Sequence, residues 1–316
     1  FDYAIGSTER ITEFEGGYAR DALMTGLEME QNEGFNPYRF GFIGSSDTHN
    51  GAGSYYEDDY FSKIGIVDGE PSGRGSAPPP GQDWDDYTPT ESQIRRGNWG
   101  ASGLTGVWAE SNTREAIFRS LRRKEVFATT GPRIRVRFFA GYDLEGVDLT
   151  ADRGVRTAYD NGVPMGGELL ARPGEPPELV IAAVQDPLSA PLQRIQVVKA
   201  WVDEDGEARE RIYDVACSDR LEPDPETHRC PDNGAEVDIS TCETRRGPGD
   251  VELRATWRDP DFNAEHHAIY YVRVLENPKC RWSTWDAIRA GVEPYPDYPA
   301  TLQDRAYTSP VWVLPQ

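Results

Sequence analysis

The sequence lacks a long hydrophobic run and is short of positive charge. No stretch approaches the roughly 18 apolar residues that a membrane-spanning helix needs, so we expect no membrane span. The 33 Lys and Arg residues are outnumbered by 54 Asp and Glu residues, which gives a formal net charge of −21. Because nucleic-acid binding needs a basic surface, this charge argues against nucleic acid as a partner.

Sequence signatures of several common enzyme classes are also missing. The chain contains no G-x-S-x-G nucleophile elbow, no phosphate-binding loop and no dinucleotide-binding fingerprint. Histidine is scarce, and no two histidines form an H-x-H pair. The four histidines are His49, His228, His266 and His267.

Cysteine is scarce as well, and all four cysteines lie in the last third of the chain, as Cys217, Cys230, Cys242 and Cys280. This clustering favours two local disulfides and an oxidising compartment, either periplasmic or extracellular. Among the possible pairings we favour Cys217–Cys230 with Cys242–Cys280; the first closes a short loop rich in Asp, Pro and Glu. The alternatives are a zinc site of four thiolates, although no C-x2-C spacing is present, and four unrelated reduced thiols.

The hydrophobic pattern divides the chain into an α/β part and a β-rich part. A helix pattern over residues 18–34 precedes an apolar run at residues 38–46, which predicts a buried strand of a parallel sheet. From about residue 140 onward, strand patterns alternate with turn residues, as in a β-sandwich. We therefore expect an α/β metal-binding domain over residues 1–139 and a sandwich-like domain over residues 140–316.

A long segment within the first part, residues 55–103, is rich in Pro, Gly and Asp. This composition is incompatible with regular structure over most of its length. Segments of this kind are usually disordered or act as functional lids. Because Trp84, Tyr87 and Trp99 lie within it, we expect a packed loop that covers a site.

Two potential metal ligands, Asp47 and His49, follow directly after the apolar run. In an extended backbone, residues two apart point to the same side, so a carboxylate oxygen and an imidazole nitrogen can converge on one cation. Such ligands suit zinc, manganese or iron. The competing interpretation is a loop aspartate that caps a turn beside a surface histidine.

The stretch FGFIGSSDTH, residues 40–49, resembles the last metal-binding motif of the PHP (polymerase and histidinol phosphatase) superfamily of metallohydrolases. The segments ASGLTGVWAESNTREAIF, GVPMGGEL and RAYTSPVW are similar, in the same order, to segments of large exported bacterial PHP-like proteins known only as a domain of unknown function. The resemblance implies that residues 1–139 are the C-terminal portion of a distorted α/β barrel in which Asp47 and His49 bind metal.

PHP sites begin with an H-x-H motif, which this chain lacks. The resemblance therefore implies that the other metal ligands belong to an N-terminal part of the same polypeptide that is missing here. The start of the chain at Phe1, without a basic-then-apolar leader, leads to the same expectation.

These features predict an exported, metal-dependent hydrolase of phosphate or related esters, to which this chain supplies part of the metal site. Bound metal would lower the pKa of a bridging water. Thr130 and Arg133 lie in a loop that can line the same site, with Arg133 as a contact for a small anionic ester. The alternative for this loop is a turn with an exposed arginine. The rival function is a non-catalytic module that binds a glycan or a protein partner.

Overall fold

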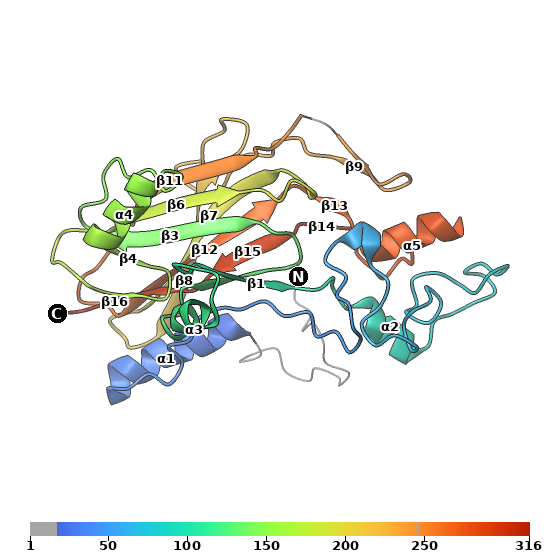
Figure 1. Cartoon of the computed structure of the whole chain (residues 1–316), viewed down its shortest axis with the longest axis horizontal. Helices are drawn as coiled ribbons and strands as arrows, with labels where there is room; N and C mark the ends of the chain where they lie inside the picture. Colours follow the sequence, from blue (N-terminus) through green and yellow to red (C-terminus); the bar gives the residue numbers. More distant parts are fainter. Residues whose placement is uncertain (1–17, 246) are drawn as a thin grey trace.

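Two open β-sheets lie face to face in the computed structural model, which describes residues 18–245 and 247–316. Helix α1 lies on the outer face of the larger sheet. A loop-rich region with helices α2 and α5 extends from one end of the molecule (Figure 1). The helices are α1 (Ala19–Glu33), α2 (Glu91–Gly97), α3 (Arg114–Arg122), α4 (Asp152–Asn161) and α5 (Trp282–Ala290), and a 3₁₀ turn, η1, covers Glu57–Asp59.

The larger sheet has eight strands in the order β1-β2-β15-β12-β16-β5, with β7 on the other edge of β12 and β8 beyond β7. All of its pairs are antiparallel except β16 with β5. Its strands are β1 (Leu104–Val107), β2 (Val126–Thr129), β5 (Glu168–Leu170), β7 (Leu192–Val202), β8 (Ala208–Cys217), β12 (Ala268–Glu276), β15 (Arg305–Thr308) and β16 (Val311–Leu314).

The smaller sheet has four antiparallel strands in the order β11-β6-β3-β4. Two further pairs of short strands, β9 with β10 and β13 with β14, lie outside both sheets. These strands are β3 (Arg135–Gly141), β4 (Gly162–Pro164), β6 (Glu178–Val184), β9 (Val237–Asp238), β10 (Glu243–Thr244), β11 (Glu252–Arg258), β13 (Lys279–Cys280) and β14 (Thr301–Leu302).

One hydrophobic core fills the space between the two sheets. Val136 and Phe138 of β3 belong to the same buried cluster as Val272 and Val274 of β12. These are alternate residues of their strands, as is usual where two sheets stack on each other. Burying each such side chain contributes about 1.5–3 kcal/mol, so contacts between the sheets hold the two halves of the chain together.

Strand β12 lies at the centre of the larger sheet, and the chain that pairs with one of its edges is interrupted once. Strands β15 and β16 pair with successive halves of the same edge of β12, and Ser309 and Pro310 separate them. At this break the Thr308 hydroxyl accepts a hydrogen bond from the Val272 backbone N–H at 2.9 Å, which satisfies the buried donor. Beyond the break, β16 pairs with β5, whereas β15 pairs with β2.

The predicted α/β barrel portion is wrong. Residues 38–48 form no strand, and β1, β2 and β15 pair in antiparallel fashion. Phe40 and Phe42 pack instead against the outer face of the larger sheet, beside Ile269 and Trp312. An apolar run can be buried by covering a sheet as well as by pairing within one, and its sequence pattern does not separate the two cases.

Strands from both sides of residue 140 share a sheet, since β2 is hydrogen-bonded to β15. The boundary expected between residues 139 and 140 falls inside β3. The two parts of the chain are joined because β15 pairs on one edge with β12 and on the other with β2, which lies far away in the sequence.

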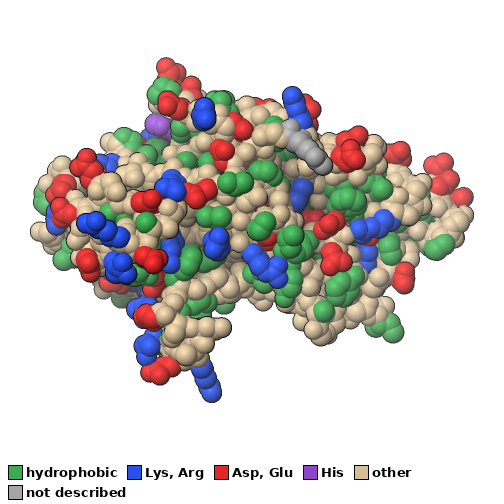
Figure 2. Space-filling model, turned by 45° about the horizontal axis from the view of Figure 1, so that its top comes forward, with side chains coloured by type: hydrophobic (Ala, Val, Ile, Leu, Met, Phe, Trp, Pro, Cys, Tyr) green, Lys and Arg blue, Asp and Glu red, His purple; other side chains and the backbone are tan. Residues whose placement is uncertain are grey.

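Charged side chains of both signs are interspersed on the face of the molecule that Figure 2 shows. Exposed pairs one helical turn apart, such as Glu115 with Arg119, add only a few tenths of a kcal/mol each. In residues 18–245 and 247–316, no helix has the length and apolar character needed to cross a membrane.

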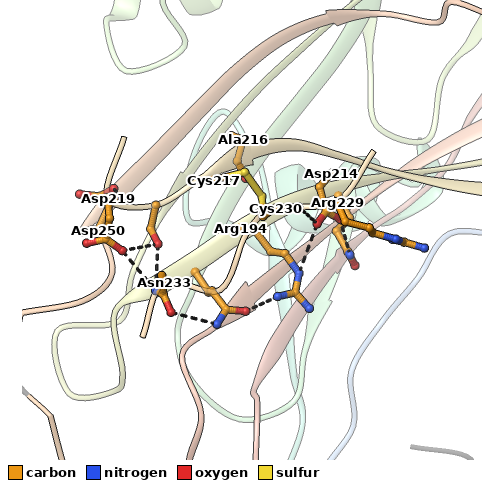
Figure 3. The surroundings of a disulfide bond; sticks show 12 residues. Arg194, Asp214, Ala216, Cys217, Asp219, Arg229, Cys230, Asn233 and Asp250 are labelled. Atoms are coloured by element: carbon orange, nitrogen blue, oxygen red, sulfur yellow. Dashed lines mark hydrogen bonds and ion pairs between the residues drawn. A yellow bond between two sulfur atoms is a disulfide. The ribbon is translucent and has the colours of Figure 1, made fainter. Parts of the chain in front are cut away.

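The two disulfides have the pairing favoured from the sequence, Cys217–Cys230 and Cys242–Cys280. Around the first, the Asp214 carboxylate accepts a hydrogen bond from the Cys230 N–H at 2.8 Å and lies near the guanidinium groups of Arg194 and Arg229 (Figure 3). Disulfides persist outside the reducing cytoplasm, so they indicate an oxidising compartment for this protein.

The Cys242–Cys280 disulfide should stabilise the fold more than Cys217–Cys230, because its ends are 38 rather than 13 residues apart. Loop-closure entropy predicts losses of about 4 and about 3 kcal/mol when the two bonds are removed. Urea denaturation of the double variants Cys242→Ser/Cys280→Ser and Cys217→Ser/Cys230→Ser measures both losses. A larger loss of stability in Cys217→Ser/Cys230→Ser than in Cys242→Ser/Cys280→Ser would contradict this ranking.

Candidate functional site

A cleft of about 630 Å³ lies where the end of the larger sheet meets the long loop of residues 55–103. Its walls come from five parts of the chain that are distant in sequence. They are the segment 44–47, the long loop, the segment 128–130 at the end of β2, Arg281 before α5, and the segment 302–307 that includes the start of β15. Only tertiary packing brings these parts together.

Buried contacts with α5 hold the long loop in place. Arg74 in the loop makes a two-pronged ion pair with Asp286, with both nitrogen–oxygen distances at 2.7 Å. Tyr60 stacks on Trp282 with their ring centroids 4.5 Å apart. Because breaking a buried ion pair typically costs several kcal/mol, this wall of the cleft is firmly anchored.

The predicted ligands Asp47 and His49 lie close together at the cleft. Asp47 lines it, and Oδ1 of Asp47 is 3.6 Å from Nε2 of His49. Both side chains are more than half exposed, at 56% and 61%. The backbone is not extended as predicted, because Asp47 adopts a left-handed conformation with φ of 51°. The His49 N–H donates to the Lys63 carbonyl oxygen at 2.7 Å, which holds this left-handed bend against the long loop.

A close backbone approach positions this turn. The Gly44 carbonyl accepts a hydrogen bond from the Thr105 hydroxyl of β1 at 2.6 Å. A Cβ atom at Gly44 would lie 2.2 Å from the Leu104 carbonyl oxygen, so only glycine fits here. The glycine therefore fixes the distance between the Asp47 turn and the edge of the sheet.

The two predicted substrate contacts have different positions. Thr130 lines the cleft, and its hydroxyl donates to Oδ1 of Asp304 at 2.5 Å. Arg133 does not line this cleft: its guanidinium donates to the Tyr56 hydroxyl at 2.7 Å, and its backbone N–H donates to Asp186. The interpretation of Arg133 as an exposed residue of a turn fits this geometry better.

Glu57 is a buried carboxyl group in the cleft wall. It belongs to the acidic stretch of residues 57–60, for which the sequence favours a solvated loop over a metal or substrate contact. It is 3% exposed, and its Oε2 accepts a hydrogen bond from the Trp282 N–H at 2.7 Å. Burial raises the pKa of Glu57 to about 7, and the nearby charge of Asp304 adds to this shift while Arg281 opposes it. A carboxyl that titrates near neutral pH inside a cleft is a candidate for proton transfer.

Four further charged residues line the cleft, and the sequence marked none of them as a site residue: Lys63, Arg281, Asp304 and Arg305. They follow no common sequence pattern: Lys63 lies in the irregular long loop, Arg281 precedes α5, and Asp304 and Arg305 follow β14. Trp282, the first residue of α5, is 1% exposed and stacks on Tyr60 of the long loop, so it serves packing between α5 and the loop.

In the part of the chain that the structure describes, no three His, Cys, Asp or Glu side chains converge on a possible metal position. Around Asp47 and His49 the described residues supply no third carboxylate, imidazole or thiolate. A catalytic zinc ion usually takes three protein ligands.

A family model described as "Protein of unknown function (DUF3604)" matches residues 2–315, and the chain belongs to this family. The match covers both sheets and every segment that lines the cleft. No curated protein and no solved structure matches the chain.

Replacement of Glu57 by glutamine should change how stability depends on pH. The folded pKa is raised from 4.5 to about 7, so the wild type loses stability as the pH rises through this interval, whereas Glu57→Gln does not. Between about pH 4.5 and pH 8 the variant should gain about 3 kcal/mol over the wild type.

Urea denaturation at both pH values measures this gain. Asp58→Asn, which changes the exposed neighbour, should show no such gain. An equal effect of Glu57→Gln at the two pH values would mean that Glu57 ionises normally.

Proposed function

We propose that the protein is a hydrolase of phosphate or related esters that depends on a divalent metal, either zinc, manganese or iron. The observation that carries this proposal is the Asp47–His49 pair at the edge of a cleft that also holds a buried carboxyl group and several cationic side chains. The substrate would be a small-molecule ester that occupies the cleft. The disulfides support a periplasmic or secreted location.

The geometry of the donor pair fits a shared cation. Bonds of about 2.0–2.2 Å at a tetrahedral angle would place two zinc ligands about 3.4 Å apart. The observed distance between Oδ1 of Asp47 and Nε2 of His49 is 3.6 Å. When bound there, such a cation would polarise the scissile group and lower the pKa of a bound water. We infer that its other ligands come from a further part of the same polypeptide.

The residues of this chain would bind the ester and move a proton. With a pKa of about 7, Glu57 exists in both protonation states near neutral pH and can accept or donate a proton. The long loop, held by the ion pair of Arg74 with Asp286, would limit the access of water to that side of the cleft. Thr130 would hold Asp304 in position rather than contact the substrate through a free hydroxyl.

Substitution of the donor pair tests this proposal. In the full-length polypeptide, Asp47→Ala and His49→Ala should each lower the bound metal by at least about tenfold, since each removes a ligand. Metal content after dialysis, measured by mass spectrometry, gives the result, and phosphatase activity should fall in parallel.

His228→Ala is the matched control, because His228 lies in the loop of the Cys217–Cys230 disulfide, outside the cleft. Unchanged metal content in both donor variants would remove the proposed site. A full-length protein that binds a glycan or a protein partner but shows no metal-dependent turnover would favour the non-catalytic alternative.

A further inference from the structure

Three cationic side chains in the cleft, those of Lys63, Arg281 and Arg305, have no carboxylate partner. Within residues 18–245 and 247–316, none of them forms an ion pair within 4.0 Å, although acidic residues outnumber basic ones in the sequence. A buried charge normally finds a partner of opposite sign, because its desolvation is costly. Three unpaired cations at one cleft therefore point to a partner from outside the chain.

Arg281 shows this most clearly. It is 2% exposed, and its Nη2 donates to the Trp99 carbonyl oxygen at 2.8 Å, whereas its buried Nη1 has no hydrogen-bond partner. Burial lowers the pKa of Arg281, and Glu57 opposes this shift. The residue is also held rigidly: it follows Cys280 of the second disulfide, and its N–H donates to the Ala300 carbonyl oxygen at 3.0 Å. An unused donor is thus fixed in the cleft wall.

Arg305 and Lys63 add to this arrangement. The buried Nε of Arg305 has no hydrogen-bond partner, while its backbone N–H is bonded to the Thr130 hydroxyl at 2.9 Å. Lys63 is 4% exposed, and no described residue accepts a hydrogen bond from its ammonium group. Burial lowers the pKa of Lys63, with Asp47 and Asp68 acting against the shift.

The carboxylates of the same cleft are already engaged elsewhere. Asp304 forms an ion pair with Lys279 at 2.6 Å and accepts from Thr130. Asp47 lies beside His49. Glu57 is bonded to the Trp282 N–H, and burial keeps part of it neutral near pH 7. Asp47 and Glu57 act on Lys63 and Arg281 at longer range, but no described carboxylate of the cleft forms an ion pair within 4.0 Å with any of the three cations.

We propose that Lys63, Arg281 and Arg305 form an anion-binding subsite that takes a doubly charged tetrahedral oxyanion, such as the phosphate or sulfate group of a ligand. Guanidinium groups suit such oxygens because their N–H donors form a planar fork, and the ammonium group adds a compact charge. The assignment of this anion to the ester group of a substrate rests on the proposed function. The binding of a free oxyanion does not.

The subsite should also be linked to protonation of Glu57. The groups around Glu57 are Arg281, Lys279, Asp304, Tyr60 and the Trp282 N–H. An ionised Glu57 repels a bound anion, so affinity should rise as the pH falls below about 7. The variant Glu57→Gln isolates this contribution, because its side chain stays neutral at every pH tested.

Calorimetric titration of the full-length protein with sodium sulfate tests the subsite, because sulfate does not titrate near neutral pH. The titrations are made with a chelator present and with ionic strength held constant by sodium chloride. We expect saturable binding of one sulfate, weakened about tenfold or more in Arg305→Gln and in Lys63→Gln. Arg281→Gln is informative if its denaturation curve remains that of a folded protein. Arg135→Gln, which removes an exposed cation on β3, is the matched control and should bind as the wild type does.

Absence of saturable sulfate binding, or full affinity in both Arg305→Gln and Lys63→Gln, would overturn the subsite. Because metal is excluded, this result is independent of the Asp47 and His49 experiment, so either proposal can fail while the other stands. Sulfate binding that is equally tight at about pH 5 and pH 8 in the wild type would overturn the link to Glu57. Phenyl phosphate, titrated in parallel, shows whether an esterified oxyanion occupies the same subsite as the free ion.

Discussion

The pairing of β12 with strands on both of its edges is the constraint on which the rest of the structure depends. Strand β7 covers one edge, and β15 and β16 share the other on either side of the Ser309–Pro310 break. Because β15 also pairs with β2, Thr130 lies next to Asp304 and Arg305 at the end of the sheet, although they are far apart in the sequence. The cleft lies at this end of the sheet.

Charges in and near the cleft divide into two groups with different physical roles. Arg74 with Asp286, and Lys279 with Asp304, are buried and paired, and they fasten the long loop and the segment before α5. Lys63, Arg281 and Arg305 are unpaired within the described residues. A paired buried charge is explained by the fold itself, whereas an unpaired one is a strain on the free protein that a ligand can relieve.

Several local features could be predicted from the sequence. The disulfide pairs follow from the clustering of four cysteines, and the closeness of Asp47 to His49 follows from their separation by one residue. The reason given for that closeness was incorrect, because a turn at Asp47 replaces the extended backbone. Arg133 lies outside the cleft, where its guanidinium donates to the Tyr56 hydroxyl, a contact that no sequence pattern indicates.

The sequence by itself determined the acidic net charge, the oxidising compartment, the β-rich character of the second half and the closeness of residues 47 and 49. Only the tertiary structure decided that Phe40 and Phe42 cover a sheet instead of forming a strand, and that Glu57, Lys63, Arg281 and Arg305 meet at one cleft. Short-range patterns record which residues avoid water. They do not record which segment covers an apolar residue or which charges meet at a cleft. Those outcomes depend on contacts between segments that can be more than 200 residues apart, such as Glu57 with Trp282.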